Sequence, residues 1–228
     1  MADPVKLSTI VTRIQRLADM ENATDFASTA FIKDLVNQSL AELIDILRSF
    51  FGQEYHRKSH PIAITSGTRA YPLPADFLAL LWAELEVSTN ETSRIHPYTV
   101  HSASHARTLH GTDPIFYRIG ERGPSNARMI DFLPEPTGTH AVVLYYIPTA
   151  PQLLNDEDTF DAVNGWEDYI VWDVVAALLN KEESDMSYAI SKREMIRKRI
   201  ESLAGATDQG SPDRIGDVQS QHPEPPYA

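Results

Sequence analysis

The chain of 228 residues contains no cysteine. This absence excludes disulfide bridges, a thiolate nucleophile and any zinc or iron–sulfur site that depends on cysteine ligands. Long apolar runs are missing too, because the longest one, at residues 170–179, is interrupted by Asp173 and is too short to span a bilayer. Charges are scattered through residues 1–19 where a secretory signal would be apolar, so we expect a protein that is made and kept in the cytoplasm.

Short signatures of catalysis and nucleotide binding are also missing. The chain has no G-x-x-x-x-G-K-[ST] or G-x-G-x-x-G run, and none of its serines stands in a G-x-S-x-G context. Asp and Glu outnumber Lys and Arg by 32 to 20, and the net charge of −12 argues against electrostatic wrapping of nucleic acid. We therefore expect a protein without enzymatic activity, cofactor or resident metal.

The charge is distributed unevenly along the last third of the chain. Residues 153–185 contain ten acids and one base, whereas residues 186–204 contain five bases and two acids. Neighbouring segments of opposite sign favour pairing within or between subunits over a free nucleic-acid-binding arm. The five bases are candidates for contact with a partner: Lys192, Arg193, Arg197, Lys198 and Arg199.

Two apolar stripes near the N-terminus predict a pair of helices. The second stripe runs through residues 31–47 and ends at Gly52, and Ser28 or Thr29 is the expected N-cap. Two helices so close in sequence form a hairpin. The first stripe recurs at helical spacing through five residues: Leu7, Ile10, Val11, Ile14 and Leu17.

The middle of the chain has the composition of β-strands. Five short β-branched or aromatic runs, each bounded by Pro, Gly or Asn, lie at residues 62–65, 80–87, 115–119, 129–133 and 141–147. They predict an antiparallel sheet or a small sandwich. Residues 98–109 lack strand alternation, and we expect a short helix there.

The C-terminal part predicts two more helices and a tail. The helix at residues 166–181 is apolar on most faces, which indicates burial, and Trp166, Tyr169 and Trp172 are interpreted as core. The next helix, at residues 186–203, should turn Ile190, Ile196, Ile200 and Leu203 inward and its bases outward. Residues 205–228 carry too little apolar surface to order alone and are expected to order on a partner.

These patterns together predict an α+β fold with a helical module built from both chain ends. The predicted divisions are an N-terminal helix hairpin at 1–58, a β-rich antiparallel module at 59–152, C-terminal helices at 153–204 that complete the helical module, and an extended arm at 205–228. In the arm, Arg214, Ile215, Val218 and Tyr227 are the candidates for partner contact.

A cluster of histidines raises the possibility of a metal site. His96, His101, His105 and His110 lie in one segment, and the second and third are four residues apart, on one face of a helix. Zinc would need a third ligand, and no Glu follows as in H-E-x-x-H. Histidines in a polar surface segment are common, so we expect no metal here, and a metal-dependent enzyme remains the alternative.

The most specific motif is the run G-T-R-A-Y-P-L-P-A-D-F at residues 67–77. It resembles the Y-x-L-P-x-D-F signature of the tailed-bacteriophage adaptor proteins, the head-to-tail connector subunits that dock beneath the portal. The helix hairpin, the I-D-F-L-P-E-P run at residues 130–136, the Y-Y-I-P run at 145–148 and the W-E-D-Y-I-V run at 166–171 also follow the order of that family. The resemblance covers about residues 5–204.

The resemblance implies a structural virion protein of the phage neck. It would form a ring of about twelve copies beneath the portal, with the helical module and arm toward the portal, the β module toward a tail or nozzle protein, and double-stranded DNA passing through the lumen without sequence-specific binding. From the motif itself, the candidates for partner contact are Tyr71, Pro72, Pro74, Asp76 and Phe77.

Two further readings are kept as alternatives. One is a different neck component of the phage, such as a tail-completion protein. The other is a small DNA-binding regulator that would use Arg193, Arg197 and Arg199, which the net negative charge disfavours.

Overall fold

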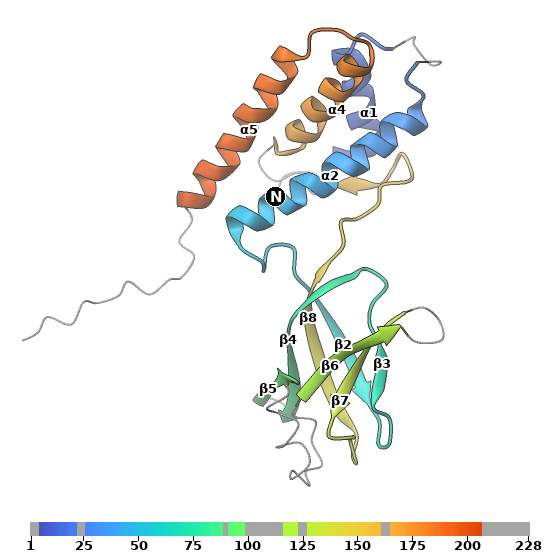
Figure 1. Cartoon of the computed structure of the whole chain (residues 1–228), viewed down its shortest axis with the longest axis vertical. Helices are drawn as coiled ribbons and strands as arrows, with labels where there is room; N and C mark the ends of the chain where they lie inside the picture. The colour runs from blue at the N-terminus through green and yellow to red at the C-terminus, as the bar shows by residue number, and fades with distance from the viewer. Residues whose placement is uncertain are drawn as a thin grey trace, which may run out of the picture.

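The computed structural model describes residues 5–21, 26–88, 91–98, 116–122, 127–160 and 165–206. Helices gather at one end of the molecule and most of the strands at the other (Figure 1). The helices are α1 (Leu7–Leu17), α2 (Thr29–Phe51), α4 (Glu167–Lys181) and α5 (Ser187–Ala206). The first two precede the strand-rich segment and the last two follow it, so the predicted α+β class with helices from both chain ends is confirmed.

The ends of α2 follow the predicted local chemistry. The Ser28 side chain accepts a hydrogen bond from the Phe31 backbone N–H at 3.3 Å, which caps the start of the helix. At the other end Gly52 adopts φ of 95°, a conformation that favours glycine and lets the chain leave the helix. Ser28 rather than Thr29 is therefore the N-cap.

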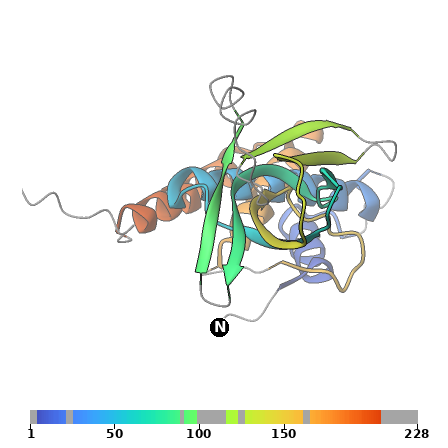
Figure 2. The same cartoon turned by 90° about the horizontal axis from the view of Figure 1, so that it is seen from below.

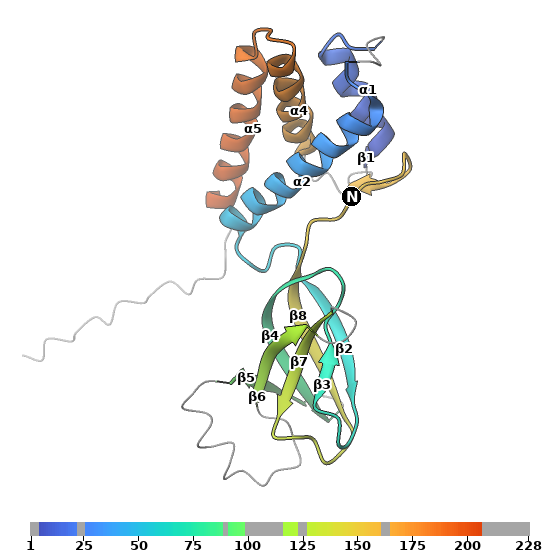
Figure 3. The same cartoon turned by 45° about the vertical axis from the view of Figure 1, so that its right-hand side comes forward.

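Helix α4 lies inside the helical module. Figure 3 shows α1 and α5 on either side of it and α2 crossing in front. Trp166 and Tyr169 are buried and Trp172 is half-buried, so the interpretation of these aromatics as core is confirmed. The buried residues of α4 itself are Tyr169, Ile170, Val171, Val174, Val175, Ala176 and Leu178.

Two predicted apolar stripes are wrong at their last positions. Leu17 is 42% exposed and Leu203 is 38% exposed. Leu17 is the last residue of α1, and Ala18 and Met20 take the buried positions just beyond it. Near the end of α5, Ile200 and Ala204 are the buried residues, so the stripe leaves the contact surface before Leu203.

The β module is one seven-stranded sheet with the order β2-β8-β4-β5-β6-β7-β3. The sheet curls around its own hydrophobic core, which includes Ile64, Phe132 and Leu144. The five predicted runs coincide with β2, β4, β6, β7 and β8. The bounds of the seven strands are β2 (Lys58–Ile64), β3 (Ala70–Pro72), β4 (Phe77–Ser88), β5 (Glu91–Pro97), β6 (Phe116–Arg122), β7 (Arg128–Leu133) and β8 (His140–Pro148).

The sheet is mixed, which corrects the expectation of a purely antiparallel module. Strands β5 and β6 pair in parallel, with His96 opposite Phe116 and Pro97 opposite Tyr117, and every other pair is antiparallel among the described residues. A parallel pair needs a long crossover, and the chain between these strands is long enough to provide one. Seen from below in Figure 2, the β4–β5 and β6–β7 hairpins run in different directions, because the sheet curls between them.

A second, two-stranded sheet belongs to the helical end. Strand β1 (Val5–Lys6) pairs with β9 (Thr159–Phe160), so the start of the chain is tied to the segment that leads into α4. Of the predicted short helix at 98–109, all residues but Tyr98 lie outside the described part of the chain, as does the predicted arm from residue 207 onward. In the described part, no helix has the length and apolar character needed to cross a membrane.

Candidate functional site

The 71–77 motif forms the turn from β3 into β4. The Tyr71 hydroxyl accepts a hydrogen bond from the Thr65 backbone N–H at 2.8 Å, and the Tyr71 ring packs on Phe132 at 5.9 Å between centroids. Leu73 and Phe77 are buried in the β core. The contacts of the motif therefore lie within the β module and stabilise it. Among its candidates for partner contact, Pro72 is exposed, Tyr71, Pro74 and Asp76 are half-buried, and Phe77 is buried.

Asp76, just before β4, links this strand to β2 and β8 at the end of the β module that faces the helices. Its carboxylate accepts hydrogen bonds from the Lys58 ammonium at 2.7 Å and the Tyr146 hydroxyl at 2.9 Å, and its backbone oxygen accepts one from the Thr149 N–H at 2.7 Å. The Lys58 hydrogen bond holds the pKa of Asp76 below its ordinary value. Burial and the bond to Asp76 raise the pKa of Tyr146 to about 12. Phe77 stacks on the Tyr146 ring at 5.8 Å.

The segment that leads from β8 back to the helices is held against α2 by hydrogen bonds and an ion pair. We call residues 148–156 the return strap. The Asn37 side chain donates to the Leu153 carbonyl at 2.9 Å and accepts from the Leu153 N–H at 2.8 Å. The Lys33 ammonium lies 3.3 Å from the Leu154 carbonyl and 2.7 Å from the Asp156 carboxylate. The Arg48 guanidinium donates to the Pro148 carbonyl at 2.7 Å.

A cleft of about 510 Å³ lies where the two modules meet. Its lining combines apolar side chains, among them Ile44 and Phe160, with the polar groups of Arg48, Lys58 and Asp76. Burial lowers the pKa of Arg48, and its Nε has no hydrogen-bond partner in the described part of the chain. The cleft therefore offers apolar contact and hydrogen-bond donors, which is the chemistry of a docking surface.

The basic face of α5 is divided between internal and external roles. Arg193 was expected to point outward, but its guanidinium lies 2.8 Å from Asp173 of α4 and 3.1 Å from Glu194. The Asp173 hydrogen bond raises the pKa of Arg193. A cation this close to a neighbouring helix gains more from the carboxylate than from water, which explains the inward turn. The exposed bases of this helix are Arg197, Lys198 and Arg199, and Lys192 is half-buried over the Tyr188 ring.

The structure does not bring the remaining candidates together. His96 is exposed on β5, while His101, His105 and His110 lie outside the described residues. Within the residues that are described, no group of three His, Asp or Glu side chains could hold a metal ion. The arm candidates also lie outside the described residues: Arg214, Ile215, Val218 and Tyr227.

The polar residues on the buried face of α2 were missed as a functional feature. Lys33, Asn37 and Arg48 lie on the same face of the helix as the buried Ile44, four, fifteen and eleven residues being the spacings of Asn37, Arg48 and Ile44 from Lys33. A polar residue that continues an apolar stripe, as Arg48 continues Leu40 and Ile44, signals a buried partner, and this signal was available in the sequence. The Lys58–Asp76–Tyr146 group joins segments far apart in the chain, so no local pattern marks it.

Of the comparisons with known proteins, the one with family models found a match. No curated protein matches the chain. The family model described as SU10 adaptor protein matches residues 5–216, which include every described element from β1 to α5. Because the match takes in nearly the whole chain, including the motif turn, the return strap and the basic helix, the chain belongs to the SU10 adaptor protein family, a family of phage head–tail adaptors, and is a structural protein of the bacteriophage.

Proposed function

We propose that this protein forms a ring in the phage neck, with its helical module against the portal and its β module toward a tail or nozzle protein. The ring would hold about twelve copies, matched to a twelve-fold portal. The genome would pass through the lumen without sequence-specific contact, and the subunit would carry out no chemistry.

One observation carries this proposal. The described residues form two separate hydrophobic cores at opposite ends of the molecule, one among the helices and one among the strands. Each core supports its own outer surface, and the Asp76 group and the return strap hold the two together. A subunit that joins two unlike partners needs two such surfaces.

The acidic character of the chain suits a DNA conduit. A negatively charged lumen repels the phosphates, so the genome can slide without sticking. Residues 153–185 concentrate acids, and this group includes the exposed Asp156, at the end of the return strap, and its exposed neighbour Glu157. A map of the assembled ring that showed a basic lumen would contradict this part of the proposal.

The ring itself is tested by imaging. Purified protein mixed with purified portal should give, in electron micrographs, portal particles with one added ring beneath them and with the symmetry of the portal. A tail-completion protein, the rival reading, would instead appear further down the neck of the virion and would leave purified portal bare. Binding of the β module to portal would contradict the proposed orientation.

The free protein should be largely monomeric at micromolar concentration. Ring closure joins many weak contacts, and the portal acts as a template that raises the local concentration of subunits. The arm at 205–228 is expected to gain protection from hydrogen exchange only beside the portal, since ordering it without a partner costs entropy. Strong protection of the arm in the free monomer would contradict this.

A further inference from the structure

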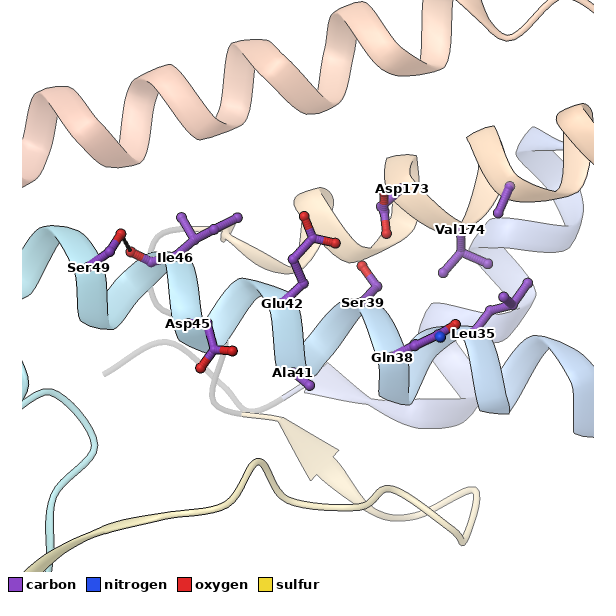
Figure 4. Close-up of a pocket in the computed structure, with 11 residues that line it drawn as sticks. Leu35, Gln38, Ser39, Ala41, Glu42, Asp45, Ile46, Ser49, Asp173 and Val174 are labelled. Atoms are coloured by element: carbon purple, nitrogen blue, oxygen red, sulfur yellow. Dashed lines mark hydrogen bonds between the residues drawn. The ribbon is translucent and has the colours of Figure 1, made fainter. Parts of the chain in front are cut away.

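A second groove lies within the helical module, away from the module junction. It runs between α2 and α4 and has a volume of about 570 Å³. Its apolar surface comes from Leu35, Ile46, Val174 and Ala177. Figure 4 shows Ser39 and Glu42 of α2 pointing toward Asp173 and Val174 of α4 across this groove, with Asp45 at the outer side of α2.

The groove is acidic. Glu42, Asp45 and Asp173 line it, and no Lys, Arg or His is among the described residues that line it. Asp173 is paired within the chain by Arg193, and Glu42 accepts a hydrogen bond from the neutral Tyr169 hydroxyl at 2.9 Å. Asp45 is 77% exposed, and its contact with Arg48 is long, at 3.6 Å. The groove therefore keeps a negative charge that the chain itself does not fully balance.

One polar atom in the groove also lacks a partner. Ser39 is 2% exposed, and its Oγ makes no hydrogen bond to any part of the chain that the structure describes. A buried hydroxyl without a partner is unfavourable by roughly 1–3 kcal/mol. The groove thus combines an apolar floor with acids, as expected of a surface that another molecule covers, while the Ser39 hydroxyl lies beneath that floor, out of a partner's reach.

The outer face of α5 has the complementary character. Tyr188, Lys192, Met195 and Arg199 follow one another at i, i+4, i+7 and i+11, which places them on one stripe of the helix. Tyr188 is 64% exposed and Met195 is 57% exposed. Tyr, Met and Arg are the residue types that protein interfaces enrich. We call these four residues the outer stripe.

None of the four residues of the outer stripe lines the groove of its own chain. Helix α5 packs on α4 through the adjoining face, where Ala189, Ile196 and Ile200 are buried, and at the edge of the stripe the Tyr188 ring also meets Trp172 of α4, with 5.5 Å between centroids. A helix that presents one face to its own module leaves the other for a neighbour. Groove and stripe are therefore two different surfaces of one subunit, which is the requirement for head-to-tail association that closes into a ring.

We propose that the α2–α4 groove receives the outer stripe of α5 from a second copy of this chain. Tyr188 and Met195 cover the apolar floor, and Lys192 and Arg199 face Asp45 and Glu42. The inference rests on the proposed ring and names the contact between its neighbouring subunits. The charge complementarity between groove and stripe is what favours a second copy as the occupant.

A cross-linking experiment tests the contact directly, because the chain has no cysteine of its own. Full-length Ala177→Cys and Met195→Cys proteins are mixed and oxidised, both free at high concentration and on purified portal. Both positions are exposed, so folding is expected to be retained, which circular dichroism checks. The expected product is a 177–195 disulfide dimer. Val87→Cys, on the exposed surface of the β module, is the matched control and should stay unlinked to either.

A charge exchange provides an independent measurement. Asp45→Lys and Lys192→Glu should each weaken self-association about tenfold, and the protein carrying both changes should recover to within about threefold of the original affinity. Glu201→Lys, on an exposed position outside the outer stripe, should change affinity by less than about twofold. Sedimentation equilibrium gives the affinities.

The outcomes separate the contact from the ring. Portal-bound rings that form without the 177–195 dimer, or a double variant that does not recover, would overturn the contact and leave the proposed function standing. A 177–195 dimer in protein that forms no ring on portal would support the contact and contradict the function. Absence of both the dimer and the ring would overturn both.

Discussion

The two modules differ in how the chain builds them. The β module is formed by one continuous segment, from β2 to β8. Half of its strand pairs join strands that follow one another in the sequence. The helical module needs both ends of the chain, since Tyr169 of α4 donates to Glu42 of α2 across 127 residues, and Arg13 of α1 pairs with Asp168 at 2.5 Å. The β module is thus an insertion in a helical domain, and the two cores should respond to damage separately.

The largest expected effect separates the two cores. Leu43→Ala in α2 and Leu144→Ala in β8 each remove a fully buried side chain, and each should lower the free energy of unfolding of its own module by about 2–5 kcal/mol. Hydrogen exchange read by mass spectrometry should show loss of protection in α1, α2, α4 and α5 for the first and in the strands for the second. Loss of protection across the whole chain in both variants would show that the modules form one cooperative unit.

The motif turn gives the next effect. Tyr71→Ala loses the hydrogen bond to Thr65 and the packing on Phe132, and we expect about 2–3 kcal/mol of destabilisation in the β module. Pro74→Gly should have the same direction and a smaller size, because it acts through the entropy of the unfolded chain. Helicity measured by circular dichroism should persist in both variants, and a global loss of helicity would contradict the separation of the modules.

The Asp76 group makes the β module sensitive to pH at both extremes. The pKa of Asp76 lies below its ordinary value, so its contribution to stability is present above the unfolded pKa of about 3.9 and is lost as the pH falls through the lower folded value. The pKa of Tyr146 is raised to about 12, so its contribution is present below about pH 10 and is lost as the pH rises through about 12.

Two matched variants separate these contributions. Asp76→Asn should cost about 2 kcal/mol at neutral pH, since hydrogen bonds to a charged group are lost, and should flatten the acid side of the stability profile. Tyr146→Phe should flatten the alkaline side and weaken the acid side less than Asp76→Asn does, because Lys58 still donates to the Asp76 carboxylate. Urea unfolding followed across pH measures both, and an unchanged acid side in Asp76→Asn would show that other carboxylates dominate there.

The smallest expected effect concerns the link between the modules. Asn37→Ala removes both hydrogen bonds to Leu153 and should lower the free energy of unfolding by roughly 1 kcal/mol. The loss stays this small because the strap is only partly buried and water can replace the lost partners. Exchange of the Leu153 and Leu154 amides should accelerate while both cores stay protected. Gln38→Ala, one position along the same helix and exposed, is the control and should leave exchange of the strap unchanged.

Periodicity was sufficient to predict the order of helices and strands but not every strand. The buried positions of α2 and α4 and the strands β2, β4 and β8 have dense apolar patterns, which depend only on local sequence. Strand β5 was missed because Ile95 is its one buried residue and the rest is polar. Strand β3 carries a proline and is only three residues long. Both form because neighbouring strands supply hydrogen-bond partners, which a local pattern does not record.

The candidate surfaces were predictable to a lesser degree. Sequence order indicated a basic α5 and an important turn at residues 71–77, and the family match agrees with the resemblance on which the turn was chosen. The inward turn of Arg193 was missed because it depends on where α4 places Asp173. Whether the chosen residues contact partners stays a prediction.

The return strap has a mechanical consequence. Its bonds to α2 are spread from Lys33 to Arg48, about 22 Å along the helix axis, and the strap runs antiparallel to that helix. A pull on the β module along the strap therefore loads these bonds at the same time, in shear, instead of peeling them off one after another. If the β module contacts the tail, as proposed, a pulling force that acts on it is distributed over about four turns of α2.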